Sequence, residues 1–187
     1  MTETIIPAFR DAPEEGKTVG RLLAGYSELE VEMLGCVLEV SGGVDAAVRA
    51  LYGTRGEQKR IEAMRSLTEV AFQKAGLGPT FAATMSDMHW CRRIRNQYAH
   101  CQWYYTTSEG LCFIDLEELA KRTAKIDVLT RDRVPVDIGI LSRQEAFFKY
   151  VQKCFWFLAE QYKINPDQRS TPLFQLPAKM DQPPLHN

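Results

Sequence analysis

The chain has 187 residues, of which 45% are hydrophobic and 25% are charged, and its formal net charge at pH 7 is −1. This length is enough to bury one hydrophobic core, and the composition excludes an intrinsically disordered protein. Because the net charge is close to zero, whole-protein electrostatics gives no reason to expect nucleic acid or a membrane as a partner. If the chain binds phosphate, a local cluster of basic side chains must supply the charge.

Targeting signals and metal motifs are missing from the sequence. The first eleven residues lack the basic stretch and apolar run of a secretion signal, and no run of about 18 apolar residues occurs. The five cysteines form no CxxC pair, and an odd number of them suits reduced, packed thiols. We therefore expect a cytoplasmic protein with no membrane association, no metal site and no cofactor.

Apolar side chains spaced three and four residues apart predict a long helix over residues 17–40. Its glycines, Gly20, Gly25 and Gly35, each weaken a helix by about 1 kcal/mol relative to alanine. We therefore expect these glycines where a neighbouring helix approaches closely. A short helix is predicted at residues 45–52.

Two further helices follow. Thr54 and Glu57 have the spacing of a capping box, which predicts a helix over residues 55–75. Pro79 suits the first turn of the next helix, which the periodicity places at residues 79–100.

The pattern changes after this helix. Residues 102–105 and 111–114 are rich in aromatic and branched side chains and flank a polar turn, which predicts a small peripheral β-hairpin. A short helix is expected at residues 116–125, followed by irregular structure through Gly139. The last helix is predicted over residues 143–163 and is unusually rich in aromatic side chains, as in a central packing helix or an interface.

The ends of this last helix set the organisation of the chain. Ser142 and Glu145 form a second capping box at its start. Beyond it, most of the prolines gather in a segment that cannot hold regular structure. We therefore predict an all-α helical domain over residues 1–164 and a proline-rich C-terminal tail over residues 165–187, in which His186 has no implied role.

The segment Arg95-Asn96-Gln97-Tyr98-Ala99-His100 ends the fourth predicted helix. At about 100° per residue, Arg92, Asn96 and His100 fall on one face, with Arg93 on its flank. Arg95 lies about 140° around the helix from His100, so within one chain the two side chains do not face each other directly.

Each of these residues also has a purely structural interpretation. Arg95 lies near the predicted buried stripe, where an ion pair with Glu28 or Glu32 of a packed helix would satisfy its charge. A histidine such as His100 in the last turn interacts favourably with the helix dipole, and Asn96 can be only a polar surface residue. The residues alone leave these alternatives open.

The segment from Arg95 to His100 resembles the R-x4-6-H motif of the HEPN superfamily, in its form with Asn directly after the Arg. The preceding long helices, the position of the motif at a helix end and the hairpin that follows fit the same resemblance, which spans roughly residues 19–114. It implies an all-α, HEPN-like helical bundle that forms a homodimer through the motif-bearing region and cleaves RNA without a metal.

The resemblance also implies roles for single residues. Cleavage by the 2′-hydroxyl of RNA needs a base, charge stabilisation on the phosphate and an acid for the leaving 5′-oxygen. His100 can be base or acid, whereas Arg95 can only stabilise charge because its guanidinium stays protonated. Asn96 can orient the phosphate or the imidazole. The candidate substrate-binding residues are Arg92, Arg93 and Tyr98.

One chain offers a single well-placed histidine, so a two-fold axis beside the motif would bring two histidines and two arginines to one phosphate. We therefore expect a dimeric, metal-independent endoribonuclease acting on RNA in a toxin or phage-defence system, with an antitoxin or other regulatory protein as a further partner. In HEPN toxins paired with nucleotidyltransferase antitoxins the motif continues as H-x-Y, whereas Gln102 stands at that position here. The alternatives are a non-catalytic HEPN module that holds a nucleotide, RNA or a partner protein, and a plain helical interaction protein.

Overall fold

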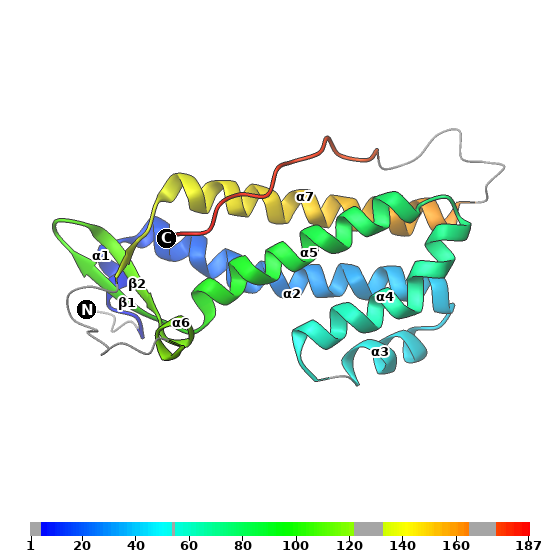
Figure 1. Ribbon diagram of the computed structural model, residues 1–187, viewed down its shortest axis with the longest axis horizontal. Coiled ribbons are helices and arrows are strands. Elements are labelled where there is room, and N and C mark those ends of the chain that lie inside the picture. Colours follow the sequence, from blue (N-terminus) through cyan, green and yellow to red (C-terminus); the bar gives the residue numbers. More distant parts are fainter. Residues whose placement is uncertain (1–4, 54, 122–132, 165–174) are drawn as a thin grey trace. The chain divides into compact units, whose positions relative to one another are not determined.

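The computed structural model describes residues 5–53, 55–121, 133–164 and 175–187, which are mostly helical and include one small sheet (Figure 1). In chain order the elements are α1 (Ala8–Asp11), α2 (Pro13–Ser41), α3 (Val44–Tyr52), α4 (Glu57–Lys74), α5 (Gly78–Ala99), β1 (Cys101–Thr106), β2 (Gly110–Asp115), α6 (Leu116–Ala120), β3 (Val134–Pro135) and α7 (Ile138–Lys163). No helix in this part of the chain is long and apolar enough to cross a membrane.

The hydrophobic periodicity located the long helices correctly. The helix predicted over residues 17–40 is α2, and the helices predicted over residues 45–52, 55–75 and 79–100 are α3, α4 and α5. The short helix α1 was not predicted, because its four residues are too few to establish a period. The helix expected at residues 116–125 is α6, and the part of that range after Lys121 lies outside the described residues.

The predicted start of α7 is wrong. Asp137 caps this helix, since its Oδ1 accepts the N–H groups of Gly139 at 2.6 Å and Ile140 at 3.0 Å. Ser142 lies inside the first turns, where its Oγ donates to the carbonyl of Ile138. We expected the cap at Ser142 because of its capping-box spacing to Glu145, but the cap is Asp137, earlier in the chain. At α4 the N-cap is Gly56, and the capping residue that we predicted, Thr54, lies outside the described residues.

Two of the three α2 glycines do not serve close helix packing. A Cβ added at Gly20 or Gly35 would meet no described atom within 4 Å. The expectation of a closely approaching helix is therefore wrong at these two positions.

The chain divides into two compact units. Unit 1 comprises Met1–Gly25, Arg93–Phe147 and Pro183–Asn187, and unit 2 comprises Tyr26–Arg92 and Phe148–Gln182. The long helices α2, α5 and α7 each contribute residues to both units. The boundary predicted at residue 164 between a helical domain and a tail stays a prediction, but the last five residues belong by their contacts to unit 1.

Unit 2 has an aromatic and aliphatic core. The rings of Phe72 and Phe81 stack with their centroids 5.0 Å apart, and Tyr162 meets Phe72 edge-on at 5.4 Å. Arg60 forms an ion pair with Glu30, whose side chain is only 9% exposed, over an Nη2–Oε1 distance of 2.7 Å. Helix α3 packs beside α4 within this unit (Figure 1).

Unit 1 is organised around the sheet. The strands β1 and β2 form the predicted hairpin, with Trp103 opposite Phe113, and β3 adds a third antiparallel strand. Helix α1 covers the hairpin and packs Phe9 edge-on against Trp103, with ring centroids 5.0 Å apart. Residues 111–114 are all buried, so β2 lies deeper than the peripheral hairpin that we expected. The third strand was missed because two residues, one of them a proline, establish no alternation.

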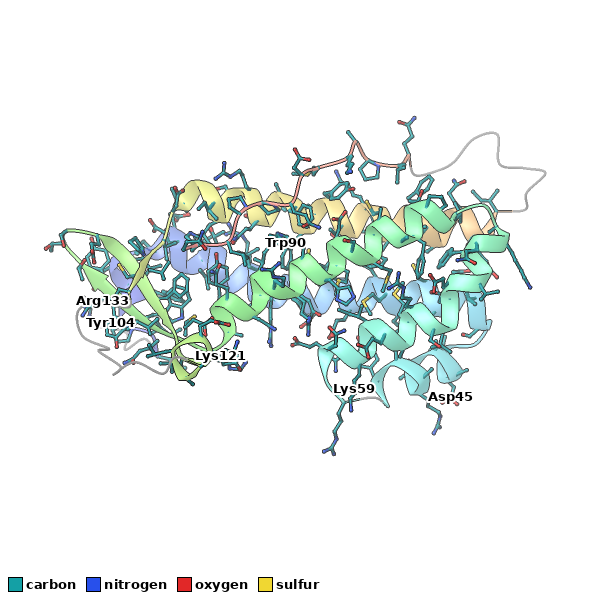
Figure 2. The ribbon with its side chains drawn as sticks, in the orientation of Figure 1. Asp45, Lys59, Trp90, Tyr104, Lys121 and Arg133 are labelled. Atoms are coloured by element: carbon teal, nitrogen blue, oxygen red, sulfur yellow. The ribbon has the colours of Figure 1, made fainter. Side chains whose placement is uncertain are left out.

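The hairpin also contacts the chain just before β3. The guanidinium carbon of Arg133 lies 4.8 Å from the ring centroid of Tyr104, and Figure 2 shows the two side chains next to each other. This is a cation–π arrangement, which ties the entry of β3 to β1.

Candidate functional site

The residues of the motif lie where α5 ends and the hairpin begins. Helix α5 stops at Ala99, and the Sγ of Cys101 donates to the carbonyl of Gln97 at 2.6 Å, which satisfies one acceptor of the last helical turn. The N–H of Leu116 donates to the carbonyl of His100 at 3.4 Å. This bond brings the start of α6 to the end of α5.

The side chain of His100 is 54% exposed, and its Nε2 lies 3.6 Å from Oε1 of Glu117 on α6. A carboxylate at this distance can orient the imidazole, and the exposure leaves the ring open to solvent and to a ligand. His100 is therefore an exposed histidine with one carboxylate beside it.

Arg95 and Asn96 form a second pair. Both side chains are half-buried, and Nη1 of Arg95 donates to Oδ1 of Asn96 over 3.2 Å. This bond uses one of the two lone pairs of the amide oxygen of Asn96, and its Nδ2 amide can donate to a ligand.

A hollow of about 480 Å³ lies beside these pairs in unit 1. Its walls come from α5, from the segment around α6 and from the last three residues of the chain. The lining residues are Arg93, Asn96, Gln97, Asp115, Glu117, Glu118, Lys121, Leu185, His186 and Asn187.

The hollow carries mixed charge with an excess of carboxylates. Asp115 caps α6, because its Oδ1 accepts the N–H groups of Glu117 at 2.9 Å and Glu118 at 3.0 Å. Lys121 neutralises Glu118, with Nζ and Oε1 2.5 Å apart. Arg93 is the second cationic residue of the lining. The hollow therefore suits a polar or partly cationic ligand better than a bare phosphate.

Tyr98 does not lie where a substrate can reach it. Its side chain is 1% exposed, and its hydroxyl donates to Oε1 of Gln144 at 2.6 Å and lies 2.8 Å from Nδ1 of His186. Its ring packs against Trp103 and Phe113, with centroids 6.1 and 5.7 Å away, and burial raises the pKa of its hydroxyl. We therefore remove Tyr98 from the predicted substrate-binding residues, because these contacts hold the core of unit 1 together.

The two adjacent arginines have different surroundings. Arg93 is exposed, belongs to unit 1 and lines the hollow. Arg92 belongs to unit 2 and is half-buried, and its Nε has no hydrogen-bond partner among the described residues. That both contact a substrate stays a prediction.

Sequence reasoning missed Gln97 and His186. The side chain of Gln97 binds the backbone of His186 twice: Nε2 donates to its carbonyl at 2.7 Å, and Oε1 accepts its N–H at 3.1 Å. Gln97 stood inside the motif without a role, and a proline-rich segment has no periodicity that would predict docking. No signal in the sequence could have found this contact.

The imidazole of His186 is buried and bonded at both nitrogens. It is 5% exposed, its Nδ1 meets the hydroxyl of Tyr98, and its Nε2 lies 2.9 Å from the N–H of Asp137. Burial lowers the pKa of His186, and interactions with Asp137 oppose that shift in part.

All five cysteines are free thiols, and four of them are buried. Burial raises the pKa of Cys101, the half-buried one at the end of α5, to about 12, so its thiol stays protonated. In the described part of the chain, no group of three or more His, Cys, Asp or Glu side chains is placed to hold a metal ion.

No protein-family model, curated protein or solved structure matches this chain. The resemblance to the HEPN superfamily therefore rests on the motif residues and on their position between a long helix and a hairpin.

Proposed function

We propose that the chain is a metal-independent endoribonuclease with a HEPN-like helical bundle and that it acts as a homodimer. The observation that carries the proposal is the exposed His100 at the end of α5, whose Nε2 lies 3.6 Å from Glu117 Oε1. The linked side chains of Arg95 and Asn96, in the last turns of the same helix, support it. A mostly helical chain with a hairpin directly after this helix fits the same family.

The proposed reaction is attack by the RNA's own 2′-hydroxyl. His100 takes the proton of that hydroxyl, the 2′-oxygen bonds to phosphorus, and the bond from phosphorus to the 5′-oxygen breaks. The products are a 2′,3′-cyclic phosphate and a 5′-hydroxyl, and the latter takes its proton from a second acid. Arg95 stabilises the charge that builds up on the phosphate, and the Nδ2 amide of Asn96 orients a phosphate oxygen. Glu117 is a positioning residue that orients the His100 ring.

The second acid is the reason for proposing a dimer. Of the other two histidines, His89 is half-buried and His186 is buried, so neither is a good candidate for the acid. A two-fold axis beside the end of α5 would supply the His100 of a second copy.

The charge of the hollow supports a second candidate function, a non-catalytic module that binds a cationic segment of a partner protein. Three carboxylates line the hollow, against Arg93 and Lys121. These carboxylates weaken the binding of a phosphate in the hollow and favour a cationic ligand there.

The test is cleavage of a labelled RNA oligonucleotide by the purified chain in excess EDTA. We expect 2′,3′-cyclic phosphate ends, and we expect His100→Gln and Arg95→Ala to lose the activity. Arg49→Ala is the matched control, because Arg49 is exposed and pairs only locally with Asp45 in unit 2. Absence of cleavage by the unmodified chain, or activity that EDTA removes and Mg²⁺ restores, would contradict the proposal.

Mixing experiments test the shared site. With free exchange, an equal mixture of unmodified chain and the Arg95→Ala/His100→Ala double variant contains about one quarter unmodified homodimers. Activity at equal total protein should fall to about that quarter, whereas independent sites would retain about half. A linear dependence on the unmodified fraction, with exchange confirmed by tagged chains, would exclude the composite site.

A further inference from the structure

The last five residues, Pro183–Asn187, bind unit 1 as an extended peptide; we refer to them as the C-terminal segment. They contain no helix or strand. Their backbone is read by two glutamine side chains: Gln97 bonds both the N–H and the carbonyl of His186, and Nε2 of Gln144 donates to the carbonyl of Pro184 at 2.8 Å. An amide side chain that satisfies both backbone polar groups of one residue is a means of recognising a backbone, independent of sequence.

The contacts of the His186 side chain make the recognition of this segment specific for its sequence. Its ring lies edge-on to Tyr98 and to Phe113, with centroids 5.9 and 6.0 Å away. Because the Tyr98 hydroxyl donates to Gln144, it accepts from His186 Nδ1, and Nε2 accepts from the N–H of Asp137. Both ring nitrogens are therefore satisfied in one neutral tautomer, a pattern that few other side chains can reproduce.

We propose that Gln97, Tyr98, Asp137 and Gln144 form a recognition site for a short extended peptide that contains a histidine. The C-terminal segment is the ligand of this site in cis, and it is removable. Its departure opens the hollow that Asn96 lines.

Two features make the segment separable from the structure that holds it. It is attached through side-chain hydrogen bonds, the ring of His186 and the buried Pro183, without strand pairing. Such segments open locally at a lower cost in free energy than the whole fold. The aromatic contacts of Tyr98 with Trp103 and Phe113 do not involve the segment, so the site keeps its shape when the segment leaves.

The C-terminal segment also forms part of the hollow beside Asn96. Leu185, His186 and Asn187 form one wall of the hollow, and Gln97 follows Asn96 directly on α5. When the segment leaves, that wall is lost and the side chain of Gln97 is released. The proposal concerns the occupant of this site and stands whether or not His100 cleaves RNA.

Hydrogen exchange measured by mass spectrometry on the full chain tests the docking. In Gln97→Glu the carboxylate still accepts the N–H of His186 but cannot donate to its carbonyl, so we expect the amides of residues 185–187 to exchange at least about tenfold faster. Gln102→Glu, an exposed residue on β1, adds the same charge and should leave their exchange unchanged. Equal exchange in the two variants would overturn the proposal.

Binding of a separate peptide tests the site itself. A fluorescent peptide with the sequence of residues 181–187 should bind the full-length His186→Ala chain, whose own segment no longer fits. It should not bind the unmodified chain, where the tethered segment competes at a high effective concentration. The same peptide with alanine in place of its histidine should bind at least about tenfold more weakly. Equal binding of the two peptides, or no binding to a His186→Ala chain with an unchanged circular dichroism spectrum, would overturn the proposal. If this variant fails to fold, the Gln97→Glu exchange measurement decides.

Discussion

Two histidines of unit 1 have opposite surroundings. His100 is 54% exposed at the end of α5, with one carboxylate 3.6 Å from its Nε2. His186 is 5% exposed between the Tyr98 ring and the start of α7, and both of its nitrogens are bonded. The first faces solvent, whereas the second joins the C-terminal segment to Tyr98 and Asp137. The catalytic role proposed for His100 therefore depends on its exposure as well as on its place in the motif.

The largest effect is expected from a change in the proposed catalytic site at the end of α5. Arg95 lies there, on the same helix as His100, and donates to the side chain of Asn96. Replacing Arg95 with alanine should lower RNA cleavage by about 10²- to 10³-fold, because one charged donor to the transition state is lost. The unfolding free energy in a denaturant titration should change by less than about 1 kcal/mol.

The opposite outcome would identify a structural arginine. A loss of about 3–5 kcal/mol in unfolding free energy would mean that Arg95 is part of a buried ion pair and not of a substrate site. In that case the proposed catalytic site around His100 would lose the residue that stabilises charge on the phosphate.

The next effect concerns His186. Replacing it with alanine removes a buried ring and its bonds to Tyr98 and Asp137, so we expect unit 1 to lose about 2–3 kcal/mol of stability. The same replacement of the exposed His100 should cost less than about 0.5 kcal/mol. Thermal and denaturant unfolding of the two variants, side by side, measure this difference. Equal losses would mean that the two histidines are not structurally distinct.

The sequence predicted the parts of this molecule that depend on periodicity. Apolar spacing located α2, α4 and α5, because burial of one face imposes a repeat on the residues of a helix. Aromatic and branched residues on both sides of a polar turn located β1 and β2. The sequence also placed Arg95, Asn96 and His100 at a helix end, which follows from the same repeat.

Contacts between distant segments left no such pattern. The docking of His186 joins it to Gln97, which is 89 positions earlier in the sequence, through two bonds that any glutamine could make to any backbone. Tyr98 was placed with the substrate-binding residues because the side of α5 that the sheet and the C-terminal segment cover cannot be read from α5 alone. The early start of α7 depended on which of two nearby residues captured the free N–H groups.

A smaller effect tests the reassignment of Tyr98. In Tyr98→Phe the ring remains but the hydroxyl that joins Gln144 and His186 is lost, so we expect a loss of about 1–2 kcal/mol in unfolding free energy. RNA binding, measured by fluorescence anisotropy, should not change. Tyr105→Phe is the matched control, since Tyr105 is 43% exposed, and its effect should be close to zero. Weakened RNA binding with unchanged stability would restore Tyr98 as a substrate contact.

The smallest effect is the pH dependence of the docked segment. Burial holds the pKa of His186 below the ordinary value of 6.5 when the segment is docked. The groups that face this ring are the Tyr98 hydroxyl and Asp137, whose carboxylate is itself near Arg143. The charged residues that line the hollow beside it are Arg93, Asp115, Glu117, Glu118 and Lys121.

Because the docked form binds fewer protons than the free form, docking is strongest above pH 6.5 and weakens as the pH falls through that value. The docking equilibrium should fall by about threefold between pH 7 and pH 6, for a free histidine that titrates near 6.5 and a docked one that stays neutral. Hydrogen exchange of residues 185–187, corrected for the intrinsic effect of pH, measures the change, and His186→Ala should show none. Stronger protection at pH 6 would mean that the docked ring is an imidazolium, which would turn Nε2 from the N–H of Asp137 to its carbonyl, 3.3 Å away. That result would reverse the contrast between the two histidines, since His186 would then carry the charge.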